Sequence, residues 1–174
     1  MKEDAKPKIQ IVKLTEDLIP LADKFDCGDL DLNEFIREDA LKYFKGKLAV
    51  TYAVFSGRDL VGFFCLNNDS IRLNPEDKKR LDRIGKSQKT YPAIKIGRLG
   101  VSRNRRGQGV GSFIIENVIG KALEHSENIG CRYVTVDAYN QDTTLKFYSK
   151  NGFKIFREKE EKDSVPMYLD ILPD

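Results

Sequence analysis

A glycine-rich turn at residues 106–112 is the part of the sequence best suited to chemistry. It reads Arg-Gly-Gln-Gly-Val-Gly-Ser and stands between an apolar strand-like run and a long helical pattern. A helix that begins there leaves backbone N–H groups without partners, and its dipole favours an anion. The glycines keep side chains away from those N–H groups, and Arg105 and Arg106 add charge-assisted donors. The turn therefore predicts a phosphate-binding site, with a tight turn into a packed helix as the alternative.

Two other phosphate-binding motifs do not match this turn. A Walker loop requires Gly-Lys followed by Ser or Thr, whereas Gly111 is followed directly by Ser112. A dinucleotide fingerprint has the spacing GxGxxG after the first strand of a doubly wound fold. Here the spacing is GxGxG and the motif lies late in the chain. The turn therefore favours neither a P-loop nucleotide-binding protein nor a dinucleotide-dependent enzyme.

The sequence gives little support for metal chemistry or a catalytic triad. Cys27, Cys65 and Cys131 are widely spaced and form no CxxC pair, so we expect reduced, buried thiols. His125 is the single histidine, which argues against a zinc site and a histidine-based triad. Reduced thiols and a charged first segment without an apolar run predict a cytoplasmic protein with no signal peptide. No apolar run approaches the roughly 20 residues of a membrane helix.

Length and composition predict one folded domain over residues 1–174. The chain is 40% hydrophobic and 33% charged, which excludes disordered, collagen-like and coiled-coil proteins. The expected order of elements is β-α-α-β-β-(α)-β-α-β-α-β-β, which indicates an α+β domain, a three-layer α/β arrangement in which helices flank one mixed sheet of six to seven strands. The expected strands cover residues 9–13, 49–55, 60–66, 93–101, 133–138, 153–156 and 165–171, and the main helices cover 29–46, 110–126 and 142–150. Residues 74–90 are expected to form a short surface helix and a loop.

Capping residues mark several helix ends. Thr15 is expected to cap a short first helix, and either Asp29 or Asp31 opens the second. Asn151-Gly152 is typical of a left-handed helix end. The second helix is expected to end at Gly46 and to bury one apolar face. That face consists of Leu32, Phe35, Ile36, Ala40, Tyr43 and Phe44.

The turn and the residues around it resemble the GNAT N-acetyltransferases. The acetyl-CoA motif of that family is Arg/Gln-x-x-Gly-x-Gly/Ala after a strand of the form L-x-V. Arg106, Gly109 and Gly111 match the motif, and Leu99 and Val101 match the strand. Two later landmarks are also present, Val-Asp-Ala-Tyr-Asn at 136–140 and a FYxxxGF-like run at 147–153. The likeness covers residues 92–156, and the expected order of elements agrees with a GNAT-like domain.

The resemblance implies acetyl-CoA as cosubstrate and no metal. The pyrophosphate would lie on the amides of residues 106–111, and the pantetheine arm would pair with the backbone at Leu99 and Val101. A nearby N–H would polarise the thioester carbonyl, and Asn140 would contact the pantetheine arm. The expected cofactor-binding residues are Leu99, Gly100, Val101, Arg106, Gly107, Gln108, Gly109, Val110, Gly111, Ser112 and Asn140.

The resemblance also implies a general acid at Tyr148, which would protonate the departing CoA thiolate. A phenol with a pKa of about 10 stays protonated at neutral pH and can donate. The alternative is a core tyrosine beside Phe147. No general base stands out, and Glu34, Asp39 and Asp69 remain open candidates. An α-amine with a pKa of about 8 needs less help than lysine at about 10.4, which favours an α-amine acceptor.

The first third of the chain resembles the toxin-type GNAT proteins. Their pattern F-x-x-G…L-x-x-F-L/I-x-x-x-A is matched by residues 25–28, 30, 32–36 and 40, and residues 96–101 are similar to their LGRLAV strand. Gly100 replaces the usual alanine and Ser102 the usual aspartate. The resemblance implies acetylation of aminoacyl-tRNA and a small DNA-binding antitoxin as partner, and many GNAT proteins dimerise. Acetylation of a small-molecule, peptide or protein amine and a non-catalytic acetyl-CoA or nucleic-acid-binding module remain alternatives.

Charge is unevenly distributed along the chain. Residues 72–106 hold twelve Lys and Arg against three Asp and Glu, whereas the rest holds 18 against 24. The three phosphates of CoA could occupy Arg103, Arg105 and Arg106. The remaining basic residues fit an RNA backbone, with a solvated loop as the alternative. They include Lys78, Lys79, Arg80, Arg83, Lys86, Lys89, Lys95 and Arg98, and Tyr91 alone is too few aromatic rings for base stacking.

Overall fold

The computed structural model describes residues 9–81, 88–155 and 163–172. Arg83, Lys86 and most of the charged loop predicted between the last two strands lie outside these residues, and so does the side chain of Arg80. The described residues cluster into two compact units. Unit 1 comprises Met1–Asn67 and Gly97–Ile114, and unit 2 comprises Asn68–Ile96 and Ile115–Asp174. The single domain predicted over residues 1–174 stays a prediction.

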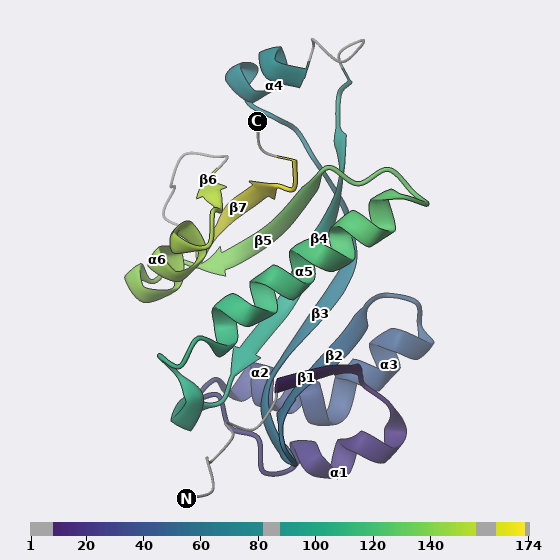
Figure 1. Cartoon of the computed structure of the whole chain (residues 1–174), viewed down its shortest axis with the longest axis vertical. Helices are drawn as coiled ribbons and strands as arrows, with labels where there is room; N and C mark the ends of the chain where they lie inside the picture. Colours follow the sequence, from purple (N-terminus) through teal and green to yellow (C-terminus); the bar gives the residue numbers. More distant parts are fainter. Residues whose placement is uncertain (1–8, 82–87, 156–162, 173–174) are drawn as a thin grey trace, which may run out of the picture. The chain divides into compact units, whose positions relative to one another are not determined.

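Seven strands form one mixed sheet in the order β1-β2-β3-β4-β5-β7-β6 (Figure 1). The pair β4–β5 is parallel, whereas β1–β2, β2–β3, β5–β7 and β6–β7 are antiparallel. The strands are β1 Ile9–Lys13, β2 Val50–Ser56, β3 Asp59–Ile71, β4 Tyr91–Val101, β5 Tyr133–Tyr139, β6 Lys154–Ile155 and β7 Ser164–Asp170. The helices are α1 Ile19–Ala22, α2 Leu30–Glu34, α3 Ala40–Lys45, α4 Pro75–Leu81, α5 Val110–Ser126 and α6 Asp142–Lys150. The predicted α+β fold, a mixed sheet flanked by helices, is confirmed.

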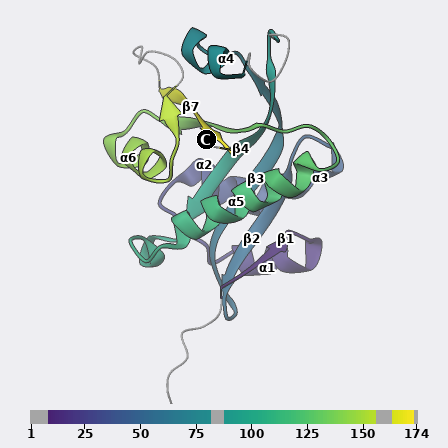
Figure 2. The same cartoon turned by 45° about the horizontal axis from the view of Figure 1, so that its top comes forward.

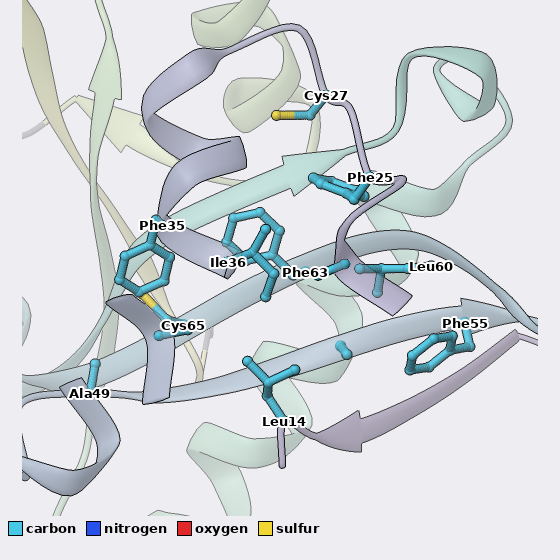
Figure 3. Packing of buried hydrophobic residues seen from close by; sticks show 13 residues of the cluster. Leu14, Phe25, Cys27, Phe35, Ile36, Ala49, Phe55, Leu60, Phe63 and Cys65 are labelled. Carbon is cyan, nitrogen blue, oxygen red and sulfur yellow. The ribbon is translucent and has the colours of Figure 1, made fainter. Parts of the chain in front are cut away.

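The core of unit 1 is built around Phe63 on β3 (Figure 3). Phe63 is fully buried, and its ring meets Phe25 edge-on at 5.5 Å and stacks on Phe35 at 6.1 Å. Phe25 and Phe35 come from the segment that resembles the toxin-type pattern. Its apolar residues therefore form the packing of this core.

The second predicted helix contains a π-helical turn, η2 Phe35–Asp39, between α2 and α3. The side chain of Asp29 accepts a hydrogen bond from the Leu32 N–H at 3.2 Å, so Asp29 rather than Asp31 caps α2. A π turn adds a residue to the helical repeat and shifts the face that follows. Phe44 is therefore only half-buried, with Lys13 Nζ 3.9 Å from its ring centre, and its predicted place on the core face is wrong.

The first predicted helix is a 3₁₀ turn, η1 Glu16–Leu18, followed by the single turn of α1. The side chain of Thr15 makes no capping hydrogen bond, so the predicted role of that side chain is wrong. The backbone carbonyl of Thr15 closes the turn instead, because it accepts from the Leu18 N–H at 3.1 Å.

Strands β2 and β3 form a hairpin with Gly57 and Arg58 in the loop, because each strand extends one residue beyond its expected end at this turn (Figure 2). Gly57 has a φ of +64°, which suits the first loop position of a two-residue hairpin. β3 continues to Ile71, well past the predicted end at residue 66. The polar run at 67–70 concealed this extension. Asp69, within that run, accepts a hydrogen bond from Thr135 Oγ1 at 2.6 Å.

Unit 2 has a core of three tyrosines. Tyr133 is fully buried and meets Tyr91 and Tyr168 edge-on, at 6.5 Å and 5.8 Å between ring centres. The parallel register runs from Ala93 opposite Tyr133 to Ile96 opposite Val136. β6 pairs antiparallel with β7 (Figure 1). Tyr91 is thus a core residue, which removes the one aromatic ring considered for contact with bases.

Helix α5 contributes residues to both units. Ile114, Val118 and Ala122 are fully buried, as its periodicity predicts. Ile115, Ile119 and Leu123 form a second apolar row at helical spacing, but Leu123 is 38% exposed, so this row does not continue into the core at that residue.

Candidate active site

The glycine-rich turn lies in unit 1, between the end of β4 and the first turn of α5. The Ser102 N–H donates to Val61 O at 2.9 Å, after which η3 Arg103–Arg105 forms a single 3₁₀ turn. The first bond of the following helix runs from the Phe113 N–H to Gly109 O at 3.0 Å. The N–H groups of residues 110–112 therefore precede the helical ladder and have no carbonyl within the helix to bind.

Two glycines of the turn are required by backbone conformation. Gly107 has a φ of +73° and Gly109 a φ of +85°, which L side chains rarely adopt. A Cβ at either position would meet no atom within 4 Å. The space at these two positions is therefore open, as a pyrophosphate beside the N–H groups of a helix start would require. Gly111 has no positive φ.

The side chains of the turn mainly hold it in place. Val110 is buried, so its backbone N–H is the group it can offer a cofactor. The Gln108 side-chain amide donates to Asn104 O at 3.0 Å. Ser112 is half-buried on α5. The predicted contribution of these three residues to cofactor binding stays a prediction.

The three arginines of the turn have partners in unit 1. Arg103 lies 3.4 Å from the carboxylate of Asp26, and Arg105 lies 3.9 Å from that of Asp59. Arg106 donates a hydrogen bond to the carbonyl of Cys27. A guanidinium carries five N–H donors, so one bond to the protein leaves others available to a phosphate. The arginines therefore anchor the turn, and their predicted contact with the CoA phosphates stays a prediction.

The last residues of β4 lie beside the core of unit 1. Leu99 and Val101 are half-buried and Gly100 is buried. A Cβ at Gly100 would lie 2.8 Å from Phe63 Cε1 and 3.3 Å from Phe63 Cδ1. The phenyl ring occupies the space that an alanine would need, which gives the departure from the toxin-type LGRLAV strand a steric reason.

Gly100→Ala is expected to destabilise the protein by about 1–3 kcal/mol, because overpacking a filled core forces side chains to move. Phe63 cannot yield freely between Phe25 and Phe35. Chemical denaturation measures the change in the free energy of unfolding. Gly120→Ala is the control, since a Cβ there would meet nothing within 4 Å and an interior helix position gains about 0.5–1 kcal/mol. An equally stable Gly100→Ala variant would contradict the packing.

Tyr148 is placed in unit 2, on α6. It is 6% exposed and lies edge-on to Phe147 at 4.9 Å and to Phe153 at 5.2 Å. Burial raises the pKa of its phenol above the ordinary value. Gly152 has a φ of +89°, and the Phe153 N–H donates to Tyr148 O at 3.1 Å, so the predicted left-handed helix end is confirmed. The phenol of Tyr148 is therefore protonated and surrounded by apolar side chains. This setting suits both a packing residue and a general acid that donates its proton.

Asn140 is also in unit 2, directly after β5. Its backbone N–H donates to Asp163 O at 2.9 Å. The predicted site residues thus fall into two groups, with residues 99–112 in unit 1 and with Asn140 and Tyr148 in unit 2.

The candidates for a general base have structural contacts or stand at the surface. Asp39 pairs with Lys42 at 2.9 Å, and Asp69 accepts from Thr135. Glu34 is exposed on α2. His125 is half-buried near the end of α5, where its carbonyl accepts from two following N–H groups. The structure distinguishes none of them as a base.

Two residues of the basic excess are engaged within the protein. Lys95 pairs with Asp137 at 2.6 Å. The Arg98 guanidinium lies 4.1 Å from the ring centre of Phe35 and 3.7 Å from Asp31. Both side chains therefore have partners within the protein, and their predicted contact with an RNA backbone stays a prediction. Lys79 and Lys89 remain exposed on and near α4.

Sequence reasoning missed the residues that hold the turn from the other side. Asp26, Cys27 and Asn33 were noted only as part of a pattern, yet their polar atoms form one connected group beside the turn. The spacing Asp-x-Gly at 26–28 is a signal for an Asx turn that could have indicated it.

The described residues include neither a metal-binding group nor a membrane-spanning helix. Within residues 9–81, 88–155 and 163–172, no three His, Cys, Asp or Glu side chains are grouped so as to hold a metal ion. No helix in these ranges has the length and apolar character to cross a membrane. Cys27, Cys65 and Cys131 are free and buried, and burial raises the pKa of each thiol.

The mixed sheet, the strand–turn–helix junction and the FYxxxGF-like helix end together define the class of N-acetyltransferases that use acetyl-CoA. A sequence model of the acetyltransferase (GNAT) domain matches residues 51–155, and the chain belongs to this family. The predicted family and enzyme class are confirmed.

Similar proteins include several toxins of this family. A tRNA-acetylating toxin of Mycobacterium tuberculosis is 28% identical over 136 residues, 75% of this chain and 76% of that protein. A tyrosine-to-phenylalanine variant of KacT has a TM-score of 0.80 and 22% identity, covering 94% of this chain and 95% of that one. AtaT complexed with acetyl-methionyl-tRNAfMet has a TM-score of 0.76 and 22% identity, covering 91% and 94%. An AtaT variant bound to acetyl-CoA and the C-terminus of the antitoxin AtaR has a TM-score of 0.70 and 20% identity, covering 94% and 93%.

Proposed function

We propose that this acetyltransferase moves the acetyl group of acetyl-CoA to the α-amine of an aminoacyl-tRNA. The observation that carries the proposal is the likeness to a tRNA-acetylating toxin over 136 residues, more of the chain than the family domain spans. The resemblance of residues 25–40 to the toxin-type pattern supports the same acceptor. The exposed lysines on and near α4 supply positive charge of the kind that RNA attracts.

Each group of site residues has a part in this chemistry. Acetyl-CoA, when bound, supplies a thioester whose carbonyl carbon is the electrophile. The N–H groups of residues 110–112, which precede the helical ladder, hold the pyrophosphate at the start of α5. The backbone at Leu99 and Val101 aligns the pantetheine arm, as an added strand would, and an N–H of β4 polarises the carbonyl. Asn140 contacts the pantetheine arm.

Tyr148 donates its proton to the sulfur as the thioester bond breaks. Because burial raises its pKa, the phenol holds that proton across the working pH range. The α-amine of the acceptor has a pKa of about 8 and is partly neutral at physiological pH, so it can attack without a strong base. Asp39 and Asp69, which already bind Lys42 and Thr135, are then not needed as bases.

Transfer of label from radiolabelled acetyl-CoA to bulk charged tRNA tests the proposal. We expect acid-insoluble label on charged tRNA and none on uncharged tRNA, since only the charged form carries an α-amine. Charged tRNA whose α-amine is chemically blocked is the matched control and should remain unlabelled. A panel of free amines, peptides and proteins measures the alternatives. Label on members of that panel without label on charged tRNA would overturn the proposal.

We further infer a small DNA-binding antitoxin as partner and the cytoplasm as location. The relative AtaT is known bound to the C-terminus of AtaR, which supports a peptide segment as the contact. Three buried free thiols support a reducing compartment, where charged tRNA is also found. Co-expression of this chain with the small protein encoded by an adjacent reading frame, followed by affinity purification, tests the partner. Recovery of this chain alone would contradict it.

A further inference from the structure

We propose that Asn33 is a positioning residue that sets the glycine-rich turn for acetyl-CoA, acting through the Asp26–Gly28 loop. The inference rests on the proposed placement of the pyrophosphate at residues 106–112. Asn33 lies on α2, is 6% exposed and belongs to the segment that resembles the toxin-type pattern. All the contacts that carry the argument lie within unit 1.

The Asn33 side chain uses both ends of its amide to shape the loop. Its Oδ1 accepts from the Cys27 N–H at 2.9 Å and from Cys27 Sγ at 3.2 Å. Its Nδ2 donates to Asp26 Oδ1 at 2.9 Å, and the same oxygen accepts from the Gly28 N–H at 2.8 Å. These donors hold the pKa of the Asp26 carboxyl below its ordinary value, with the amide of Asn33 as the largest cause.

The loop in turn binds both ends of the η3 turn. Asp26 O accepts from the Arg103 N–H at 3.0 Å, and Cys27 O accepts from the Arg106 guanidinium. These two carbonyls point at the turn because Asn33 and Gly28 fix the peptide planes of the loop. Arg103 adds a charge contact with Asp26 at 3.4 Å.

Gly28 completes the fit between loop and turn. Its φ is +84°, and a Cβ there would lie 2.6 Å from Arg103 Nε. The backbone of Gly28 therefore lies so close to the Arg103 guanidinium that no side chain would fit between them. Asn33, the loop and the η3 turn form a continuous chain of contacts that ends at Arg106, the first residue of the glycine-rich turn.

Pre-organisation of a binding loop lowers the cost of ordering it when a ligand binds. Loss of the Asn33 amide would leave the Cys27 N–H and Asp26 without their partner and free the loop to shift. The turn would then sample other conformations, and its N–H groups would bind a pyrophosphate more weakly.

Asn33→Ala is the test variant and Ile36→Val the matched control. Ile36 is fully buried on the same helical segment, so its truncation also lowers stability but removes no hydrogen bond near the turn. We expect Asn33→Ala to weaken the binding of CoA, measured by calorimetry, about tenfold, whereas Ile36→Val changes it less than about twofold. In the CoA-free protein, hydrogen exchange of the Arg103 amide should quicken in Asn33→Ala relative to Ile36→Val. The KM for acetyl-CoA should rise while kcat at saturating acetyl-CoA changes less than about twofold.

Equal CoA affinity and equal Arg103 exchange in the two variants would overturn the inference. This readout is separate from the proposed acceptor. A wild-type chain that binds CoA but labels no charged tRNA would refute the proposed function and leave the positioning role of Asn33 open to the same measurement.

Discussion

Tyr148→Phe is expected to lower kcat about 100-fold, the scale at which a positioned acid contributes to a proton transfer. The substitution removes one oxygen and keeps the ring between Phe147 and Phe153, so the fold should survive. Initial rates of thiol release from acetyl-CoA, measured with saturating acceptor, give kcat. The KM for acetyl-CoA should change little, because the phenol acts on the sulfur only as the bond breaks.

Tyr91→Phe is the matched control for this experiment. Tyr91 is another buried tyrosine of unit 2, packed on Tyr133 and outside the FYxxxGF-like run. Its loss of a hydroxyl should leave kcat within about twofold of the wild type. If the kcat of Tyr148→Phe equals that of this control, Tyr148 is a packing residue and not a general acid.

The raised pKa of Tyr148 also predicts how pH affects stability. An unfolded phenol ionises at about pH 10, whereas the buried one stays neutral to higher pH. Its contribution to stability is therefore fully present below pH of about 10 and is lost as the pH rises toward the folded value. Denaturation curves above that pH should show a smaller decline for Tyr148→Phe than for the wild type. The acid should remain protonated, and competent, throughout the neutral range.

Gly109→Ala is expected to raise the KM for acetyl-CoA at least about tenfold, a loss near 1.4 kcal/mol of binding. The φ of +85° costs an L residue about 1–2 kcal/mol, and its methyl group would stand in the open space above the turn. The backbone strain and the added methyl group both arise in the turn whose N–H groups are proposed to bind the pyrophosphate. Equilibrium binding of CoA and the free energy of unfolding measure the two separately.

Gly57→Ala provides the control for backbone strain. Gly57 has a φ of +64° and open space around its Cβ position, but it lies in the β2–β3 hairpin. Both variants should lose similar stability, whereas only Gly109→Ala should lose affinity for CoA. If Gly109→Ala binds CoA as tightly as the wild type, the pyrophosphate does not bind at this turn.

Much of the fold followed from features that are local in the sequence. The helical spacing of Ile114, Val118 and Ala122 predicted the buried face of α5. Asn151-Gly152 predicted a left-handed helix end. Such signals depend on the periodicity and backbone preferences of neighbouring residues, which is why they can be interpreted before the chain is folded.

The sequence-based predictions were wrong where a local irregularity changed which face of a helix is buried or where a strand ends. The π turn at Phe35–Asp39 moved Phe44 off the core face, and the polar run after Leu66 concealed the last part of β3. Neither a π turn nor a polar strand has a strong signature in composition, because packing against other segments decides both.

By itself the sequence determined the family, the enzyme class and the glycine-rich turn, since these depend on residue types at short, fixed spacings. Tertiary structure alone decided the use of the charged and polar side chains. Arg98, one of the basic residues expected to fit an RNA backbone, stacks on Phe35, and Arg106 donates to a carbonyl 79 residues away along the chain. Partners so distant in sequence meet only when packing brings their segments together, so no pattern of neighbouring residues could have assigned Asn33 to the turn that we propose it positions.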